Sequence, residues 1–180
     1  MWIGVGMTEV YKALYDDVGI RGVAYAEVKE ARAFQLPDSG IVERWQPFVL
    51  RLRKGDLADY LSSNLGCRLC SDRLKAILGK CAAPIDELQW LPVDVRRLDE
   101  SHPYWILHFP SPPDVLDRNA TIFAAGFVAK PVLSKDAVKG HHVFSHPGDG
   151  GLRLFVERSV TKAFKAAKLK GIKWSRAAIR

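Results

Sequence analysis

The pattern of apolar and polar residues predicts more strands than helices, and most of the strands fall in the second half of the chain. Two apolar segments, residues 91–95 and 104–109, flank a polar turn at 99–103 and predict an antiparallel hairpin. Further strands are predicted over residues 23–28, 46–52, 121–128, 142–145 and 152–156. The residues Gly148-Asp149-Gly150-Gly151 are typical of a hairpin turn and join the last two of these strands.

Four short helices are predicted where a capping residue precedes apolar residues spaced three and four apart. The capping residues are Thr8, Asp56, Ser71 and Ser159. We expect the first helix to run to about residue 17, the third to end at Gly79 and the last to end at Gly171. Together these elements predict an α+β fold with a mainly antiparallel sheet and several short amphipathic helices.

Length and composition favour one domain over residues 1–180. With 48% hydrophobic and 26% charged residues, the chain is ordinary for a soluble globular protein and long enough to bury a sizeable core. Turn-forming residues at 36–40 separate an N-terminal lobe, residues 1–40, from the rest of the chain. Residues 1–7 are apolar, but they are few, lack a basic flank and are soon followed by acidic residues. They fit neither a signal peptide nor a membrane span, so we expect a cytoplasmic protein that is not bound to a membrane.

The net charge of +7 comes from the C-terminal end of the chain. Residues 1–161 hold 20 basic and 20 acidic groups, and the remaining basic residues are Lys162, Lys165, Lys168, Lys170, Lys173, Arg176 and Arg180. A basic segment attracts nucleic acid, an acidic membrane surface or an acidic protein. On a helix that starts near Val160, however, the apolar residues share one face and the lysines lie opposite, which is typical of a solvated surface. Nucleic-acid binding through this segment is therefore the less favoured interpretation.

Several residues invite a metal or redox interpretation. Cys67, Cys70 and Cys81, with His142 and His146, are zinc-type ligands. The two histidines are expected about 13 Å apart on a strand, which is too far to share one metal ion. The odd number of cysteines favours reduced thiols, and a redox role requires an exposed thiolate in a positive field. We predict no metal and no cofactor.

Catalytic patterns are similarly weak. The segment Gly4-Val5-Gly6 opens like a dinucleotide-binding loop, but Glu9 replaces the third glycine. Ser145, His146 and Asp149 are the residue types of a catalytic triad, yet their position on a hairpin turn favours a structural role. Asp114 and Asp117 are candidates for an acid/base pair, but nothing in the sequence predicts a cleft around them. No catalytic residue is predicted, and an enzyme is the least favoured class.

The aromatic residues point to packing and to binding. Trp90, Trp105 and Phe109 lie in or beside predicted strands, where core packing is the usual role. Trp174 lies near the end of the chain, between Lys173 and the nearby Arg176. Protein-binding surfaces commonly combine an exposed aromatic side chain with arginine, so these three residues are the candidate partner-binding residues.

Seven short motifs together resemble a bacterial immunity-protein family, which was first catalogued as a domain of unknown function and later assigned to polymorphic-toxin systems from its genomic setting. The motifs are Trp45-Gln46-Pro47, residues 55–60, residues 69–74, Trp90-Leu91-Pro92-Val93, residues 104–107, Val115-Leu116-Asp117 and residues 169–172. The resemblance covers about residues 45–175. It implies a cytoplasmic protein that binds and neutralises a partner toxin without catalysis of its own, and the motif residues look architectural.

The charge of the chain bears on the partner that this resemblance implies. Inhibitors of nucleases tend to be acidic because they compete with nucleic acid for a basic cleft, whereas this chain is basic. Electrostatic complementarity then favours an acidic partner, or a contact surface away from the C-terminal end. A cytoplasmic scaffold or regulatory protein-interaction domain on the same fold is the alternative to a toxin inhibitor. The sequence does not predict the oligomeric state.

Overall fold

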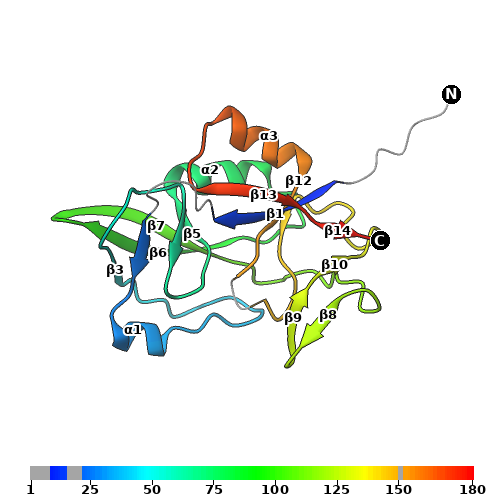
Figure 1. Cartoon of the computed structure of the whole chain (residues 1–180), viewed down its shortest axis with the longest axis horizontal. Helices are drawn as coiled ribbons and strands as arrows, with labels where there is room; N and C mark the ends of the chain where they lie inside the picture. The colour runs from blue at the N-terminus through cyan, green and yellow to red at the C-terminus, as the bar shows by residue number, and fades with distance from the viewer. Residues whose placement is uncertain (1–8, 16–21, 150–151) are drawn as a thin grey trace.

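A computed structural model describes residues 9–15, 22–149 and 152–180, and these residues form three helices and fourteen strands (Figure 1). The helices are α1 (Val28–Ala33), α2 (Asp72–Cys81) and α3 (Arg158–Ala166). The strands are β1 (Val10–Tyr15), β2 (Val23–Tyr25), β3 (Val49–Leu52), β4 (Tyr60–Ser63), β5 (Leu69–Ser71), β6 (Gln89–Arg97), β7 (Glu100–His108), β8 (Ile122–Ala124), β9 (Phe127–Lys130), β10 (Val132–Leu133), β11 (Val143–Phe144), β12 (Phe155–Glu157), β13 (Ile172–Arg176) and β14 (Ala178–Ile179).

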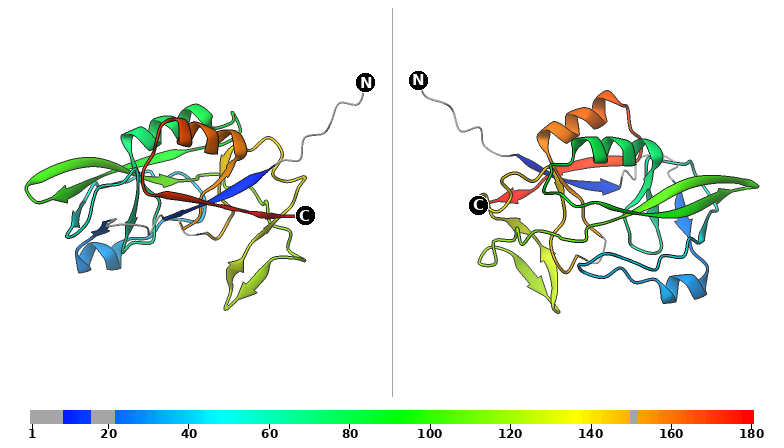
Figure 2. Two further views of the ribbon diagram at one scale, coloured as in Figure 1. Left: turned by 45° about the horizontal axis from the view of Figure 1, so that its top comes forward. Right: turned by 180° about the vertical axis from the view of Figure 1, so that it is seen from behind.

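Six strands close into a barrel in the order β2-β3-β6-β7-β5-β4. Its longest part is the β6–β7 hairpin, in which Val93 pairs with Tyr104, and the tip of the hairpin projects from the body of the molecule (Figures 1 and 2). Leu91, Val93 and Val95 are buried while the residues between them are exposed, as the two-residue period of a strand requires. These side chains belong to a core cluster that fills the barrel.

A second, four-stranded antiparallel sheet has the order β11-β12-β1-β13. The helices α2 and α3 lie side by side on one side of the molecule, and α1 lies on the opposite side (Figures 1 and 2). The apolar faces of α2 and α3 bury Leu74, Leu78, Val160 and Phe164 in one cluster between the helices and the strands. Helices this short are marginally stable alone, so most of their stability comes from packing of these apolar faces.

The expectation of an α+β fold is confirmed, and the expectation of antiparallel pairing is only partly confirmed. Among the described strands, eight pairs are antiparallel and three are parallel. The parallel pairs are β2 with β4, β3 with β6, and β10 with β14. Parallel neighbours need long connections, and the chain between β3 and β6 contains β4, β5 and α2.

Two predicted helices are wrong. Residues 10–15 of the helix predicted over residues 8–17 form the strand β1, which pairs with β12 and β13 on its two edges. The helix predicted after Asp56 is wrong as well, because Tyr60 and Leu61 belong to β4 and pair with Cys70 and Leu69. In both segments the few apolar residues fit the period of a helix as well as that of a strand. Pairing with strands that are distant in sequence makes both segments strands.

The strand predicted over residues 121–128 is instead a hairpin of β8 and β9. Ala125 and Gly126 form its two-residue turn with φ of +48° and +81°, as a primed hairpin turn requires. The prediction over residues 23–28 is right only for β2, because Val28 already begins α1. The predicted antiparallel hairpin is confirmed, but its turn is shorter than the predicted residues 99–103, because Glu100 already pairs with Arg97 at the start of β7. The antiparallel pairing of β11 with β12 is confirmed as well.

Helix boundaries agree with the predictions only in part. Ser71 caps α2 as expected, since its hydroxyl accepts a hydrogen bond from the Leu74 backbone N–H at 3.2 Å, but the helix continues past Gly79 to Cys81. Ser159 does not cap α3, which already begins at Arg158, and its hydroxyl donates to Glu157 instead. The helix α3 ends at Ala166, well before Gly171. None of the helices in the described part of the chain is long and apolar enough to span a membrane.

Candidate functional site

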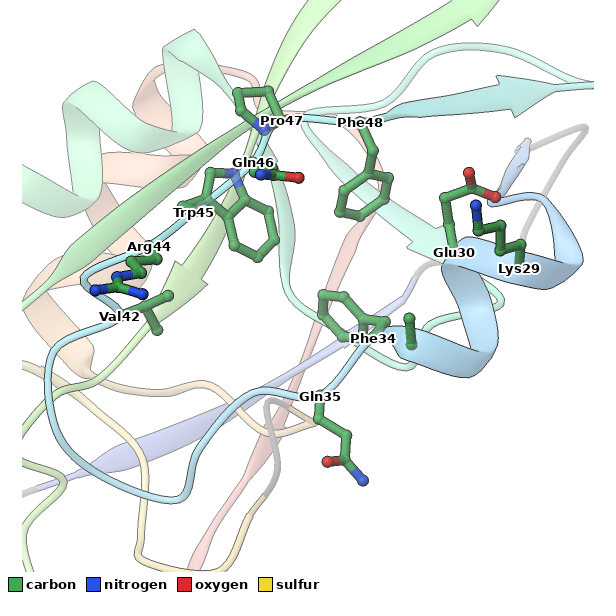
Figure 3. Close-up of a pocket in the computed structure, with 11 residues that line it drawn as sticks. Lys29, Glu30, Phe34, Gln35, Val42, Arg44, Trp45, Gln46, Pro47 and Phe48 are labelled. Carbon is green, nitrogen blue, oxygen red and sulfur yellow. The ribbon is translucent and has the colours of Figure 1, made fainter.

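A groove of about 580 Å³ lies between α1 and the irregular segment that leads into β3, residues 42–48 (Figure 3). Its apolar surface is made by three half-buried aromatic side chains, Phe34, Trp45 and Phe48. The Phe34 ring meets those of Phe48 and Trp45 edge-on, with centroids 6.1 and 6.4 Å away, and the Trp45 and Phe48 centroids are 5.6 Å apart. These are favourable aromatic geometries, so the three rings form one cluster that is open on one side.

The segment that carries Trp45 is fixed to the barrel by hydrogen bonds. The side chain of Gln89 accepts from the Val42 N–H and donates to the Val42 carbonyl, both at 2.9 Å. The indole N–H of Trp45 donates to the Pro92 carbonyl at 2.8 Å. The aromatic rings also pack against the core cluster of the barrel. The groove is therefore preformed, which lowers the entropic cost of binding at it.

The charged residues around the groove are mostly basic. Lys29 and Arg44 line it, are exposed, and form no ion pair with any described residue. Glu30 is the one carboxylate among the lining residues, and its Oε2 atom is buried and accepts no hydrogen bond from the described part of the chain. Such a surface suits recognition of an apolar side chain beside polar groups. The residues that line the groove do not pair a nucleophile with a general base.

The structure brings Ser145, His146 and Asp149 together, but not as a catalytic triad. The Ser145 hydroxyl donates to Asp149 Oδ2 at 2.9 Å and accepts from Arg68 at 2.7 Å. Asp149 also forms a buried ion pair with Arg68, and His146 Nδ1 lies 2.8 Å from the Pro147 carbonyl. The adjoining space is only about 10 Å³, too small for a substrate. The carboxylate that accepts from Ser145 is already paired with the Arg68 guanidinium, and no hydrogen bond joins His146 to the Ser145 hydroxyl among the described residues. This arrangement lacks the serine–histidine pair of a triad and favours a structural role for the cluster.

Arg68 is the residue of this cluster that sequence reasoning missed. It lies between Cys67 and Leu69, and only 2% of its side chain is exposed. It donates to the Leu107 carbonyl and its guanidinium lies 4.9 Å from the centroid of Phe109. The signal that points to it is a lone charged residue in an otherwise apolar segment, because a buried charge requires a partner.

The comparison with protein families decides the classification of the chain. The model of the immunity protein family Imm11 matches residues 23–178. The chain belongs to this family. The resemblance predicted over residues 45–175 is thereby confirmed, and the match also includes α1 and with it both walls of the groove. No curated protein matches the chain.

In this Imm11 chain the candidate partner-binding residues lie on β13. Trp174 is half-buried, and its ring centroid lies 5.3 Å from that of Phe164 on α3. Arg176 is exposed and pairs with Glu9 at 3.3 Å. Lys173 is exposed, and strand alternation places it on the opposite face from Trp174 and Arg176. The assignment of these three residues to a partner surface stays a prediction.

The other aromatic candidates divide between core and surface. Phe109 is buried, in agreement with the prediction, whereas Trp90 and Trp105 are half-buried. The Lys75 ammonium lies 2.9 Å from the Trp105 ring centroid, and the Trp105 indole N–H donates to Asp72. The same ammonium lies 6.0 Å from the Trp90 ring centroid, so a side chain of the same protein lies over both tryptophans. Burial beside them lowers the pKa of Lys75.

The cysteines of this Imm11 chain are thiols rather than disulfides. Burial raises the pKa of Cys67 to about 11 and raises that of Cys70 as well, and it also raises the pKa of the half-buried Cys81. A thiol that stays protonated at neutral pH is a poor nucleophile and a poor metal ligand. The described residues contain no group of three histidine, cysteine or acidic side chains placed to hold a metal ion.

The remaining sequence candidates are accounted for in local structure. His142 Nδ1 lies 3.1 Å from the Cys81 carbonyl. Asp114 pairs with Arg118, four residues later. The Asp117 carboxylate accepts from the Asn119 backbone N–H, which is a turn contact. The segment Gly4-Val5-Gly6 lies outside the described residues.

Proposed function

We propose that the chain is a toxin-neutralising immunity protein of a bacterial polymorphic-toxin system. In this proposal it acts in the cytoplasm as a non-catalytic binding protein whose partner is the cognate toxin. The observation that carries the proposal is the match of the Imm11 family to residues 23–178. The preformed aromatic groove and the structural role of the Ser145 cluster support binding over catalysis.

The direct test is a growth assay with a candidate toxin from the same host as this chain. We expect the toxin to arrest growth when it is expressed alone and to be tolerated when the chain is co-expressed. Affinity purification of the tagged chain should then yield a stoichiometric complex with the toxin from a nuclease-treated lysate. Arrest that persists despite a soluble, folded chain would remove the proposal and favour the scaffold alternative.

Nucleic acid is the third candidate partner, and salt separates it from a protein partner. Binding through phosphate contacts weakens steeply as the salt concentration rises. If the affinity purification yields no protein from the nuclease-treated lysate but yields DNA or RNA when the nuclease is omitted, the basic C-terminal segment becomes the functional surface.

A further inference from the structure

The aromatic groove has the properties of a specific contact site and not only of a surface hollow. Its volume of about 580 Å³ falls within the ~300–1,000 Å³ range of ligand pockets. Phe34, Trp45 and Phe48 turn toward one another across it (Figure 3). Aromatic side chains in a pre-ordered pocket, with arginine beside them, are the usual centres of binding energy in protein interfaces.

Electrostatics indicate which partner side chains suit the groove. Lys29 and Arg44 stand exposed at it without an ion pair to any described residue. Glu30 is the opposing charge among the lining residues, and it is half-buried with its Oε2 atom out of contact with solvent. Glu43 is adjacent to Arg44 in sequence but does not line the groove. Two basic side chains and one acidic side chain thus line the groove, and charge complementarity favours carboxylates on the partner.

A neighbouring hollow, lined by two basic and two acidic residues, adjoins the groove. It has a volume of about 300 Å³ and shares Glu30 and Phe48 with the groove. Arg96 lines this hollow, is exposed, and forms no ion pair with the described residues. Arg51 and the exposed Glu27 also line it and form a long ion pair of 3.9 Å. An acidic chain that runs from the groove across this hollow therefore meets Arg96, whereas Glu27 offsets the charge of Arg51.

We propose that the groove seats an apolar side chain of the toxin that is flanked by aspartate or glutamate. The proposal rests on the proposed function and names the contact surface and the chemistry of the toxin segment. The apolar side chain packs on the aromatic rings, and the flanking carboxylates lie near Lys29 and Arg44. This surface is separate from the candidate residues on β13. Trp174 of β13 packs against α3, and α1, which lines the groove, lies on the opposite side of the molecule from α3 (Figure 2).

The chemistry of the groove is tested with synthetic peptides and the isotopically labelled full-length chain. One peptide carries a tryptophan flanked by aspartate and glutamate, and the other carries the same tryptophan flanked by lysines. We expect the acidic peptide to shift the amide resonances of residues 29–48 and to bind at least about tenfold more tightly than the basic one. Equal binding of both peptides, shifts elsewhere only, or no binding of the acidic peptide would overturn the proposal.

Two matched variants test the same surface with the toxin itself. Lys29→Glu/Arg44→Glu reverses two exposed charges at the groove, and Lys162→Glu/Lys168→Glu makes the same change in net charge on and just after α3. We expect the groove variant to weaken toxin binding at least about tenfold at low salt, mainly through slower association, and the α3 variant to bind normally. Both proteins should unfold like the wild type, because all four side chains are exposed.

The outcomes separate this proposal from the proposed function. If the wild type neutralises the toxin and the groove variant does so equally well, the groove assignment is wrong and the immunity function stands. If only the α3 variant loses toxin binding, the groove assignment is again wrong, and the basic C-terminal segment becomes the contact surface. If the wild type does not bind the toxin at all, the proposed function fails, and the peptide titration still decides whether the groove binds acidic segments.

Discussion

The Arg68 side chain shows how single buried residues constrain this chain. Its guanidinium and the carboxylate of Asp149 are both only 2% exposed, and Asp149 also accepts from the Ser145 hydroxyl and the Arg153 backbone N–H. A desolvated charge is tolerated only when partners replace its hydration. The pair therefore joins the residue just before β5 to the segment between β11 and β12, two parts of the chain that are far apart in sequence.

We expect Asp149→Ala to lower the free energy of unfolding by about 3 to 5 kcal/mol, since it leaves the Arg68 charge buried without its counterion. The measurement is urea denaturation followed by circular dichroism. The exposed pair Asp114–Arg118 supplies the control, because Asp114→Ala should cost no more than about 0.5 kcal/mol. The double variant Arg68→Met/Asp149→Ala should be less destabilised than Asp149→Ala alone, and equal costs for the buried and exposed pairs would contradict this account.

Because the thiol of Cys67 is buried, we expect the folded chain to lose stability at alkaline pH. Its ordinary pKa of 9.0 is raised to about 11 by burial in the folded chain. Between these two values the unfolded state has released a proton that the folded state retains, so stability is complete below pH 9 and falls as the pH rises to 11. The contribution of this one group is about 2 to 3 kcal/mol.

The check is to measure the free energy of unfolding across this pH range for the wild type and for Cys67→Ala. The variant should lose less stability over the range, because it lacks the titrating group. Cys81→Ala is the matched control at a half-buried position and should change the slope less. Identical slopes for the wild type and Cys67→Ala would show that the thiol does not titrate in this way.

Helix ends provide the clearest prediction at the scale of elements. The Ser71 hydroxyl accepts from the Leu74 N–H and donates to the buried Asp59 at 2.7 Å. The Ser159 hydroxyl instead donates to Glu157, two residues earlier, and caps no backbone N–H of α3. We expect Ser71→Ala to cost about 1 to 2 kcal/mol and Ser159→Ala to stay within about 0.5 kcal/mol. Thermal and urea unfolding of the two variants measure this difference. Equal costs would mean that the cap at Ser71 contributes little.

The elements that the sequence predicts correctly are those with local partners. The β6–β7 hairpin joins residues that are neighbours along the chain, and α2 carries its own cap and apolar stripe. The strand β1 could not be predicted, because its partner β12 begins at Phe155. The aromatic groove was missed for a related reason. Trp45 stood out as a motif residue, but the opposite wall is α1, a helix of six residues without a side-chain cap.

At the scale of the whole molecule, the basic C-terminal segment is part of the folded structure. The strand β13 pairs with β1 from Tyr11 to Tyr15, and Trp174 packs against Phe164 of α3. The strand β14 then pairs in parallel with β10. The excess charge counted from the sequence thus lies on α3, on β13 and on the residues that follow these elements, all in the folded part of the chain, which composition alone does not reveal. A detachable nucleic-acid-binding arm would not have these contacts.

Removal of residues 172–180 tests this view of the segment. The deletion takes away β13 and β14, leaves one edge of β1 without its ladder and uncovers Phe164. We expect the shortened chain to lose cooperative thermal unfolding and its near-ultraviolet circular dichroism, because an exposed strand edge and an opened core are both destabilising. Lys162→Glu/Lys168→Glu should keep both signals, since it changes charge without removing an element. A shortened chain that melts like the full protein would return the segment to the role of an accessory basic arm.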